Sequence, residues 1–134
     1  QVSQIACIAA LEDQSSYIRD VNKKLLEKKN TICHAIKKIN HLDYIEPDGA
    51  FYIFLNIKKF FNLCYKNKTI KNSEDFANVL LNEYYVVTLA GSYFGTEGYL
   101  RITLATSTEE ILESLKRLEK FTKTLKGIKT ISSC

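Results

Sequence analysis

The sequence predicts an α+β fold: a sheet with helices packed on one face, entered through a long linking helix. Three observations predict this class. Apolar residues recur at helical spacing in the first third of the chain, β-branched and aromatic runs fill its middle, and a second helical pattern follows the last of these runs. The chain has 134 residues, 46% of them hydrophobic and 25% charged, which is enough for one globular core without metals or disulfides.

Two helices of different character are predicted before the sheet. The segment from Ile5 to Leu11 is apolar nearly all round, as in a short helix buried inside something larger. A long helix is expected next, over about 25 residues and therefore about 35–40 Å, which is the length of a connector. Its N-cap candidates are Asp13, Ser15 and Ser16. Its apolar stripe consists of Ile18, Val21, Leu25, Ile32, Ile36 and Ile39.

The middle of the chain contains most of the predicted strands. Extended segments flank a turn at residues 47–49, and residues 50–57 have the β-branched and aromatic composition of a buried strand. The basic stretch at residues 58–72 is the least regular part of the sequence. Residues 84–89, with the sequence YYVVTL, again have strand composition.

Two further helices are predicted from their capping residues. Asn72 or Ser73 can cap a helix that runs to about Glu83. The last helix begins at Ser107, where STEE fits the S-x-x-E capping box with Glu110 as its acidic residue. Sheet strands with helices packed on one side give an α+β domain.

Composition and residue spacing argue against several classes of function. The net charge is +4, but the lysines are spread along the chain rather than gathered into a stripe, which argues against nucleic-acid binding. No apolar run approaches the roughly 18 residues of a transmembrane helix, and no signal peptide is recognisable, so we expect a cytoplasmic protein without membrane contact. The four cysteines lie far apart without a CxxC pair, and His34 and His41, on one expected helical face, have no ligand set near them. We therefore expect reduced thiols and no metal site.

The strand GYLRITLA at residues 98–105 carries an arginine at its centre, in a chain with only three arginines. Side chains alternate between the faces of a strand, so Leu100, Ile102 and Leu104 share the row that the last helix can cover. Arg101 then lies on the other, more open face, beside a glycine-rich loop. A guanidinium offers a rigid fork of donors that can bind a carboxylate through two hydrogen bonds, which lysine cannot do. Arg101 is therefore a candidate for binding a small carboxylate, against the alternative of an ordinary surface arginine.

Three segments are specific enough to compare with known families: PDGAFYIF at 47–54, AGSYFGTEGYLRITLA at 90–105 and EEILESLKRLEKF at 109–121. In this order and at these intervals they resemble the C-terminal part of class I aminotransferases. These are fold-type I, pyridoxal-phosphate-dependent enzymes of the aspartate aminotransferase group. The leading segment at 3–30 is similar to the end of the large domain of this family and the long helix that leaves it. One departure is Ala90, where the family usually has proline before G-S-x-F-G.

The resemblance implies roles for two residues. The arginine of the G-Y-x-R-I motif binds the substrate α-carboxylate in the family, and Arg101 matches it. Phe51 of GAFY would lie on the substrate side of the small domain, although an aromatic residue in a buried strand more often belongs to a core. The Schiff-base lysine and the other cofactor-binding groups of the family precede this region. We therefore expect no catalytic, cofactor-binding or metal-binding residue in this chain, which alone would be inactive.

The resemblance also implies a division into parts. Residues 1–12 would be the end of the large cofactor-binding domain, and residues 13–42 the long linking helix. Residues 43–126 would form the small C-terminal α+β domain, followed by a frayed tail at 127–134. The parent enzyme would be a homodimer that binds pyridoxal 5'-phosphate.

The expected function is the transfer of an amino group between an amino acid and a 2-oxo acid. Aspartate with 2-oxoglutarate is the favoured pair, and an aromatic or prephenate-type acceptor is the main competitor. A first alternative from another class is a non-catalytic regulatory domain with a ferredoxin-like sheet, in which Arg101 holds an effector. A second is an RNA-binding domain that uses residues 58–71, which would need exposed aromatic side chains on a sheet beside the lysines.

Overall fold

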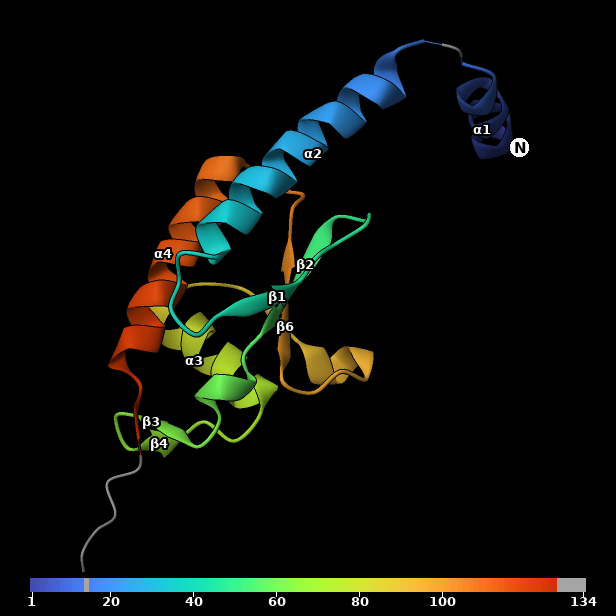
Figure 1. Cartoon of the computed structure of the whole chain (residues 1–134). Helices are drawn as coiled ribbons and strands as arrows, with labels where there is room; N and C mark the ends of the chain where they lie inside the picture. The colour runs from blue at the N-terminus through green and yellow to red at the C-terminus, as the bar shows by residue number, and fades with distance from the viewer. Residues whose placement is uncertain (14, 128–134) are drawn as a thin grey trace, which may run out of the picture.

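The computed structural model describes residues 1–13 and 15–127 as four α-helices, two short 3-10 helices and seven strands (Figure 1). The α-helices are α1 (Val2–Glu12), α2 (Tyr17–Ile36), α3 (Ser73–Tyr84) and α4 (Thr108–Thr124). The 3-10 helices are η1 (Lys58–Phe60) and η2 (Gly91–Phe94). The strands are β1 (Asp43–Ile45), β2 (Tyr52–Asn56), β3 (Leu63–Tyr65), β4 (Lys68–Thr69), β5 (Leu89–Ala90), β6 (Tyr99–Thr103) and β7 (Lys126–Gly127).

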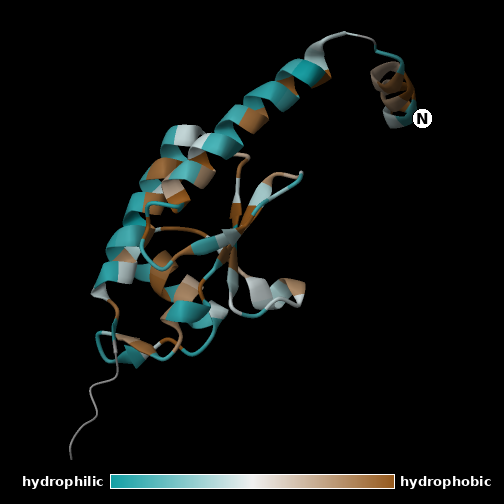
Figure 2. Ribbon diagram, in the orientation of Figure 1, coloured by the Kyte–Doolittle hydropathy of each residue, from teal (hydrophilic) through white to brown (hydrophobic). Residues whose placement is uncertain are grey.

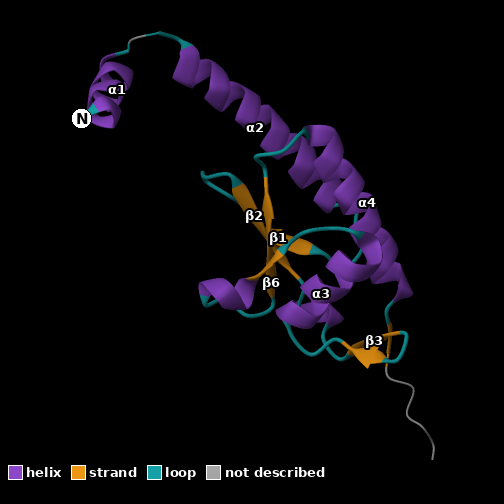
Figure 3. Cartoon of the chain, turned by 180° about the vertical axis from the view of Figure 1, so that it is seen from behind, coloured by secondary structure: helices purple, strands orange, loops and turns teal. Residues whose placement is uncertain are grey.

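Four strands form an antiparallel sheet in the order β1-β2-β6-β5. Strands β2 and β6 are paired along their length, with Leu55 opposite Leu100 and Phe54 opposite Arg101. Helices α2, α3 and α4 lie on one side of this sheet, and the described α-helices leave its other face open (Figures 1 and 3). The predicted α+β architecture, with helices on one face, is confirmed.

The core lies between the sheet and the three helices. Phe121 of α4 and Phe76 of α3 are both fully buried, and their ring centroids are 4.8 Å apart. The sheet contributes its inward-facing row. The other large residues that are fully buried are Ile32, Ile36, Ile53, Leu55, Ile57, Ile70, Leu80, Leu100 and Leu118. Burial of these apolar side chains is the main favourable term in folding.

Helices α3 and α4 begin at the residues that their sequences predict. The Asn72 side chain accepts a hydrogen bond from the Asp75 backbone N–H at 2.8 Å and so caps α3. At α4, Ser107 and Glu110 form the reciprocal capping box. Each cap satisfies backbone N–H groups that have no partner within the helix.

The long helix is shorter than predicted. Helix α2 has 20 residues and ends at Ile36, because the chain then turns to enter β1. Ile39 donates to the Ile36 carbonyl at 2.9 Å and remains buried, so it belongs to the core but not to the helix. His41 adopts a left-handed backbone conformation with φ of 65°. The expectation that His34 and His41 share one helical face is therefore wrong.

The segment YYVVTL is also not the predicted strand. Tyr84 completes α3, and Tyr85 turns the chain with a left-handed φ of 55°. The backbone N–H of Val86 then donates to the Leu80 carbonyl at 3.1 Å, and its side chain is buried in the core. Only Leu89–Ala90 pairs with β6. The apolar composition of this segment reflects packing beneath α3 rather than sheet pairing.

A second sheet has three short strands in the order β4-β3-β7, and two of them, β3 and β4, come from the stretch predicted to be irregular. Cys64 pairs with Thr69 within the β3–β4 hairpin, and Leu63 pairs with Gly127 of β7. The predicted tail is therefore wrong at Gly127, which is part of this sheet. Residues 128–134 lie outside the described residues.

Helix α1 has no buried residue, although its residues are mainly hydrophobic, whereas those of α2 are largely hydrophilic (Figure 2). The expectation that a larger region covers it stays a prediction. In the described ranges, no helix combines the length and the apolar character that crossing a membrane requires.

Candidate functional site

Arg101 lies at the centre of β6 and projects from the open face of the sheet. Its neighbours across the ladder are Phe54 on β2 and Leu89 on β5. Because side chains alternate along each strand, Tyr52 and Tyr99 project from the same face. Arg101 is half-buried on this side, while its neighbour Leu100 is fully buried on the other. The predicted orientation of both residues is confirmed.

Aromatic rings surround the Arg101 guanidinium. Its Cζ atom lies 3.9 Å from the centroid of the Phe94 ring and 5.1 Å from that of Tyr52. Phe54 makes edge contacts with Tyr52, Phe94 and Tyr99, at centroid distances of 6.2, 6.1 and 6.4 Å. The guanidinium thus lies over two rings, Phe94 and Tyr52, of a group of four connected rings, which we call the aromatic patch (Tyr52, Phe54, Phe94 and Tyr99).

The hydrogen-bond donors of Arg101 have no acidic partner in the part of the chain that the structure describes. Arg117, by contrast, pairs with Glu113 at 3.0 Å on the surface of α4. A ring face attracts a guanidinium without accepting conventional hydrogen bonds from its N–H groups, so these donors remain available to a ligand. This arrangement suits a ligand with a carboxylate, which can accept two of these hydrogen bonds at once.

The turn that carries Phe94 is held in place by tight backbone packing. A Cβ atom on Gly91 would lie 2.2 Å from the Thr96 carbonyl oxygen and 2.8 Å from that of Tyr99, so only glycine fits there. The Thr96 N–H donates to the Gly91 carbonyl at 2.9 Å, and Gly95 adopts a left-handed φ of 71°. The G-S-x-F-G motif therefore encodes the shape of this turn.

Two carboxylates tie the same turn to the N-terminus of α3. The Ser92 hydroxyl donates to Glu74 at 3.2 Å. Glu97 accepts from the backbone N–H groups of Ser73 and Gly98, at 2.8 and 2.9 Å. Burial favours the neutral form of Glu97, but these backbone donors outweigh it, so the pKa of this carboxyl lies below its ordinary value. Sequence reasoning gave no indication of this role for Glu97.

Phe51 directly precedes Tyr52 in the chain, and its side chain is not in the core. It precedes β2, its side chain is 56% exposed, and its carbonyl oxygen accepts from the Leu104 N–H at 2.6 Å. It lines a groove of about 370 Å³ between α2 and the β1–β2 turn, with Leu26 and Lys29 on the helix side. The core alternative for Phe51 is therefore wrong. Tyr52, the next residue, contacts Arg101 but was not predicted, because this contact depends on the pairing of β2 with β6.

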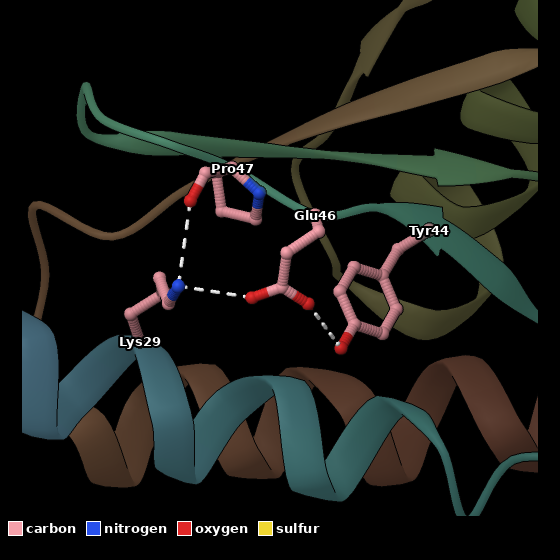
Figure 4. A network of polar contacts seen from close by, with 4 residues as sticks. All are labelled: Lys29, Tyr44, Glu46 and Pro47. Atoms are coloured by element: carbon pink, nitrogen blue, oxygen red, sulfur yellow. Dashed lines mark hydrogen bonds and ion pairs between the residues drawn. The ribbon is translucent and has the colours of Figure 1, made fainter.

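The β1–β2 hairpin is fastened to α2 by a polar network (Figure 4). Lys29 donates to Glu46 at 2.9 Å and to the Pro47 carbonyl at 3.4 Å, and the Tyr44 hydroxyl donates to the same carboxylate at 2.9 Å. The hydrogen bond between Lys29 and Glu46 raises the pKa of Lys29 and lowers that of Glu46. Nearby, Lys28 donates to the Thr106 carbonyl beyond β6 at 2.8 Å. Lys28 and Lys29, in the middle of α2, therefore join this helix to one end of the β2–β6 pair, where Tyr52 lies opposite Thr103.

The described residues argue against the other classes of site. They contain no group of His, Cys, Asp and Glu that could hold a metal ion. In the basic segment, Phe60 is buried, and Phe61 and Tyr65 pack against the core, so these rings do not form an RNA-stacking surface. Cys7, Cys33 and Cys64 are free thiols, while Cys134 lies outside the described residues.

The ferredoxin-like alternative is wrong as to topology. That fold has two split βαβ units, in which strands joined by a crossover helix lie on either side of another strand. Here β1 and β2 are neighbours joined by a hairpin turn, and the sheet order is β1-β2-β6-β5. The alternative of a regulatory domain assumed a ferredoxin-like sheet, and the observed sheet does not support that assumption.

Comparisons with known proteins agree with the motifs in the site. The chain matches the family model for aminotransferase class I and II over residues 1–118. It is 38% identical to a probable aspartate/prephenate aminotransferase of Rickettsia conorii over 120 residues, which are 89% of this chain and 30% of that protein. It is 36% identical to an aspartate aminotransferase of Pyrococcus horikoshii, over 87% of this chain and 29% of that protein.

A solved structure with the same fold is the crystal structure of the aspartate aminotransferase from Rhizobium meliloti. The two agree with a TM-score of 0.87 at 28% sequence identity, over 93% of this chain and 32% of that one. The chain thus spans 29–32% of the length of these relatives. On the family match, the sequence identity to these relatives and the shared fold, the chain belongs to the class I and II aminotransferases.

Proposed function

We propose that this chain is the part of a pyridoxal-phosphate-dependent aminotransferase that binds the α-carboxylate of the substrate, with Arg101 as the carboxylate ligand. One observation carries the proposal: Arg101 is half-buried on an open sheet face, against Phe94 and without an acidic partner among the described residues. A charged group in such a place has its donors directed toward something other than its own domain. Family membership makes an amino acid carboxylate the natural ligand.

The guanidinium can orient the substrate as well as attract it. A carboxylate bound by two parallel N–H groups has a fixed plane and direction, whereas an ammonium group fixes neither. Each charge-assisted hydrogen bond contributes about 1.5–3 kcal/mol. Holding the carboxylate in one orientation places the α-amino group and the α-carbon at a defined distance from the sheet, which is the contribution that positioning makes to catalysis.

Pyridoxal phosphate would supply the electron sink for this reaction. The residues around Arg101 do not fit that cofactor, because the aromatic patch has no carboxylate for a pyridine nitrogen. The lysine beside the aromatic patch is Lys58, whose Nζ atom lies over the Tyr99 ring, 5.1 Å from its centroid. We therefore assign the cofactor to residues outside those described, and propose residues 1–12 as the end of a large domain, 13–42 as the link and 43–126 as the small domain.

We propose aspartate and 2-oxoglutarate as the substrates, since both curated relatives described above carry aspartate in their names. Arg101 is the arginine on the open face of the described sheet, so the distal carboxylate of such a substrate would be bound by residues beyond this chain. Phe51 is proposed as a contact on the substrate side, from its exposed side chain in the groove between α2 and the β1–β2 turn. The active form is proposed to be a cytoplasmic homodimer.

The test is Arg101→Lys in the full-length enzyme, which keeps the charge and removes the fork. Loss of one charge-assisted hydrogen bond should lower kcat/KM for the amino acid by about 10- to 150-fold. The melting temperature should stay within about 2 °C of wild type, because the side chain lies outside the core. Arg117→Lys, which alters a surface ion pair with Glu113 and a 3.5 Å hydrogen bond to the Tyr84 carbonyl, is the matched control and should leave kcat/KM unchanged. Loss of melting temperature in proportion to activity would instead assign Arg101 to structure.

A further inference from the structure

We propose that Phe94 is a positioning residue for Arg101: its ring holds the guanidinium plane in the orientation that presents two N–H groups to the substrate carboxylate. This inference rests on the proposed function and adds how Arg101 is held in the orientation that binds a carboxylate. Tyr52 is proposed as a second, weaker support. Neither residue needs to touch the substrate in order to act.

The contact geometry is that of a cation lying on a ring. The Arg101 Cζ atom is 3.9 Å from the Phe94 ring centroid, well within the roughly 6 Å over which a ring face attracts a cation. The Tyr52 ring is farther away, at 5.1 Å. Phe54, directly opposite Arg101 in the sheet, touches both rings by edge contacts and so keeps them in place.

A ring is better suited to this role than a carboxylate would be. An acidic neighbour could orient the guanidinium, but it would occupy the N–H groups and neutralise the charge that the substrate needs. A ring face attracts the cation without accepting hydrogen bonds from its edges. An arginine side chain is flexible when free, and holding it in its bound orientation removes part of the entropic cost of binding.

The support is itself rigid. Phe94 ends η2, where a Cβ on Gly91 has no room, and the turn continues through Gly95 in the left-handed region. Ser92 and Glu97, on either side of Phe94, are hydrogen-bonded to Glu74 and to the Ser73 backbone at the start of α3. The neighbouring Tyr93 is equally part of η2 but is 67% exposed and has no described contact with Arg101. The turn therefore presents one aromatic ring to the arginine and another to the surface.

This difference supplies a matched pair of variants in the full-length enzyme. Phe94→Leu keeps apolar bulk but removes the ring face, and should raise KM for the amino acid about 3- to 10-fold with kcat changed by less than about 2-fold. Phe94→Tyr keeps the ring and should restore the wild-type KM. Tyr93→Leu, in the same turn, should have no effect on KM. Melting temperatures are measured for each, and kinetics are compared well below the lowest of them.

A double-mutant cycle separates positioning from general support of the fold. In an enzyme that already carries Arg101→Gln, adding Phe94→Leu should change kcat/KM by less than about 2-fold, because the cation it acts on is gone. A full Phe94→Leu penalty in that background, or failure of Phe94→Tyr to restore KM, would overturn the positioning role while leaving the proposed function intact. If Arg101→Gln alone leaves KM unchanged, the proposed function itself fails, and this inference fails with it.

Discussion

The two faces of the four-stranded sheet are built from the same strands but serve different purposes. On the closed face, Leu55 and Leu100 are 0% exposed beneath the helices. On the open face, Tyr52 is 42% exposed and lies beside the half-buried Arg101. A one-residue step along β2 or β6 therefore separates a core position from a candidate ligand contact.

The two faces of the sheet differ in how completely other residues cover their side chains. On the closed face, the buried apolar side chains belong to one core cluster that also contains residues of α2, α3 and α4. On the open face, four rings and one guanidinium contact each other but are left partly exposed. Exposed apolar patches of this kind commonly mark a site for a ligand or another part of a protein. Changes on the closed face should therefore act on stability, and changes on the open face on ligand binding.

The largest expected effect tests the closed face. Phe121→Ala removes a fully buried ring that packs on Phe76, Tyr65 and Tyr84, and should cost about 3–5 kcal/mol in unfolding free energy. Tyr52→Ala on the open face should cost less than about 1.5 kcal/mol, because its ring is partly exposed. Urea denaturation measures both. Equal losses would mean that the two faces do not differ in this way.

The second effect tests the turn beside the open face. Gly91→Ala forces a Cβ into the Thr96 carbonyl, so the backbone must shift, at a cost of about 1–3 kcal/mol. Gly49→Ala, in the β1–β2 turn, has nothing within 4 Å of the new atom and no left-handed φ to satisfy. It should be neutral or stabilise by about 0.4–1 kcal/mol. A neutral Gly91→Ala would show that the turn is less tightly packed than the distances indicate.

Local signals explain what could be predicted from the sequence. The caps at Asn72 and Ser107 act within one helical turn, so their partners are a few residues away and visible in the sequence. The face on which Arg101 projects follows from alternation within a single strand. These features need no knowledge of which strand pairs with which.

The remaining features depend on contacts between distant segments. The contacts of Arg101 with Tyr52 and Phe94 need the β2–β6 register and the path of η2, and neither is encoded locally. The pairing of Leu63 with Gly127 joins strands too short to have a pattern of their own. The segment YYVVTL was wrongly predicted to be a strand, because the same β-branched and aromatic residues are favoured by burial and by strand pairing. The aromatic patch was therefore outside what the sequence could predict, although its arginine was not.

A smaller effect concerns the helix that covers the closed face. Ser107→Ala removes the capping box at the start of α4 and should cost about 0.5–2 kcal/mol in unfolding free energy. Ser16→Ala is the comparison, because Ser16 stands at the N-cap of α2 without accepting from a helical N–H. It should change the unfolding free energy by less than about 0.5 kcal/mol. If both variants cost the same, the reciprocal bonds at Ser107 do not stabilise α4.

The smallest effect separates the two faces by pH. The folded pKa of Glu97 lies below its ordinary value of 4.5, so its ionised form stabilises the turn above that value and the contribution is lost as pH falls through the folded pKa. Wild type should therefore exceed Glu97→Gln in unfolding free energy at pH 7, by less than about 1 kcal/mol because solvent screens the carboxylate. The difference should shrink as pH falls below 4.5. The Phe121→Ala penalty involves no titrating group and should stay constant over the same range, so a parallel decline of both differences would show that acid loosens the whole fold rather than the turn beside Arg101.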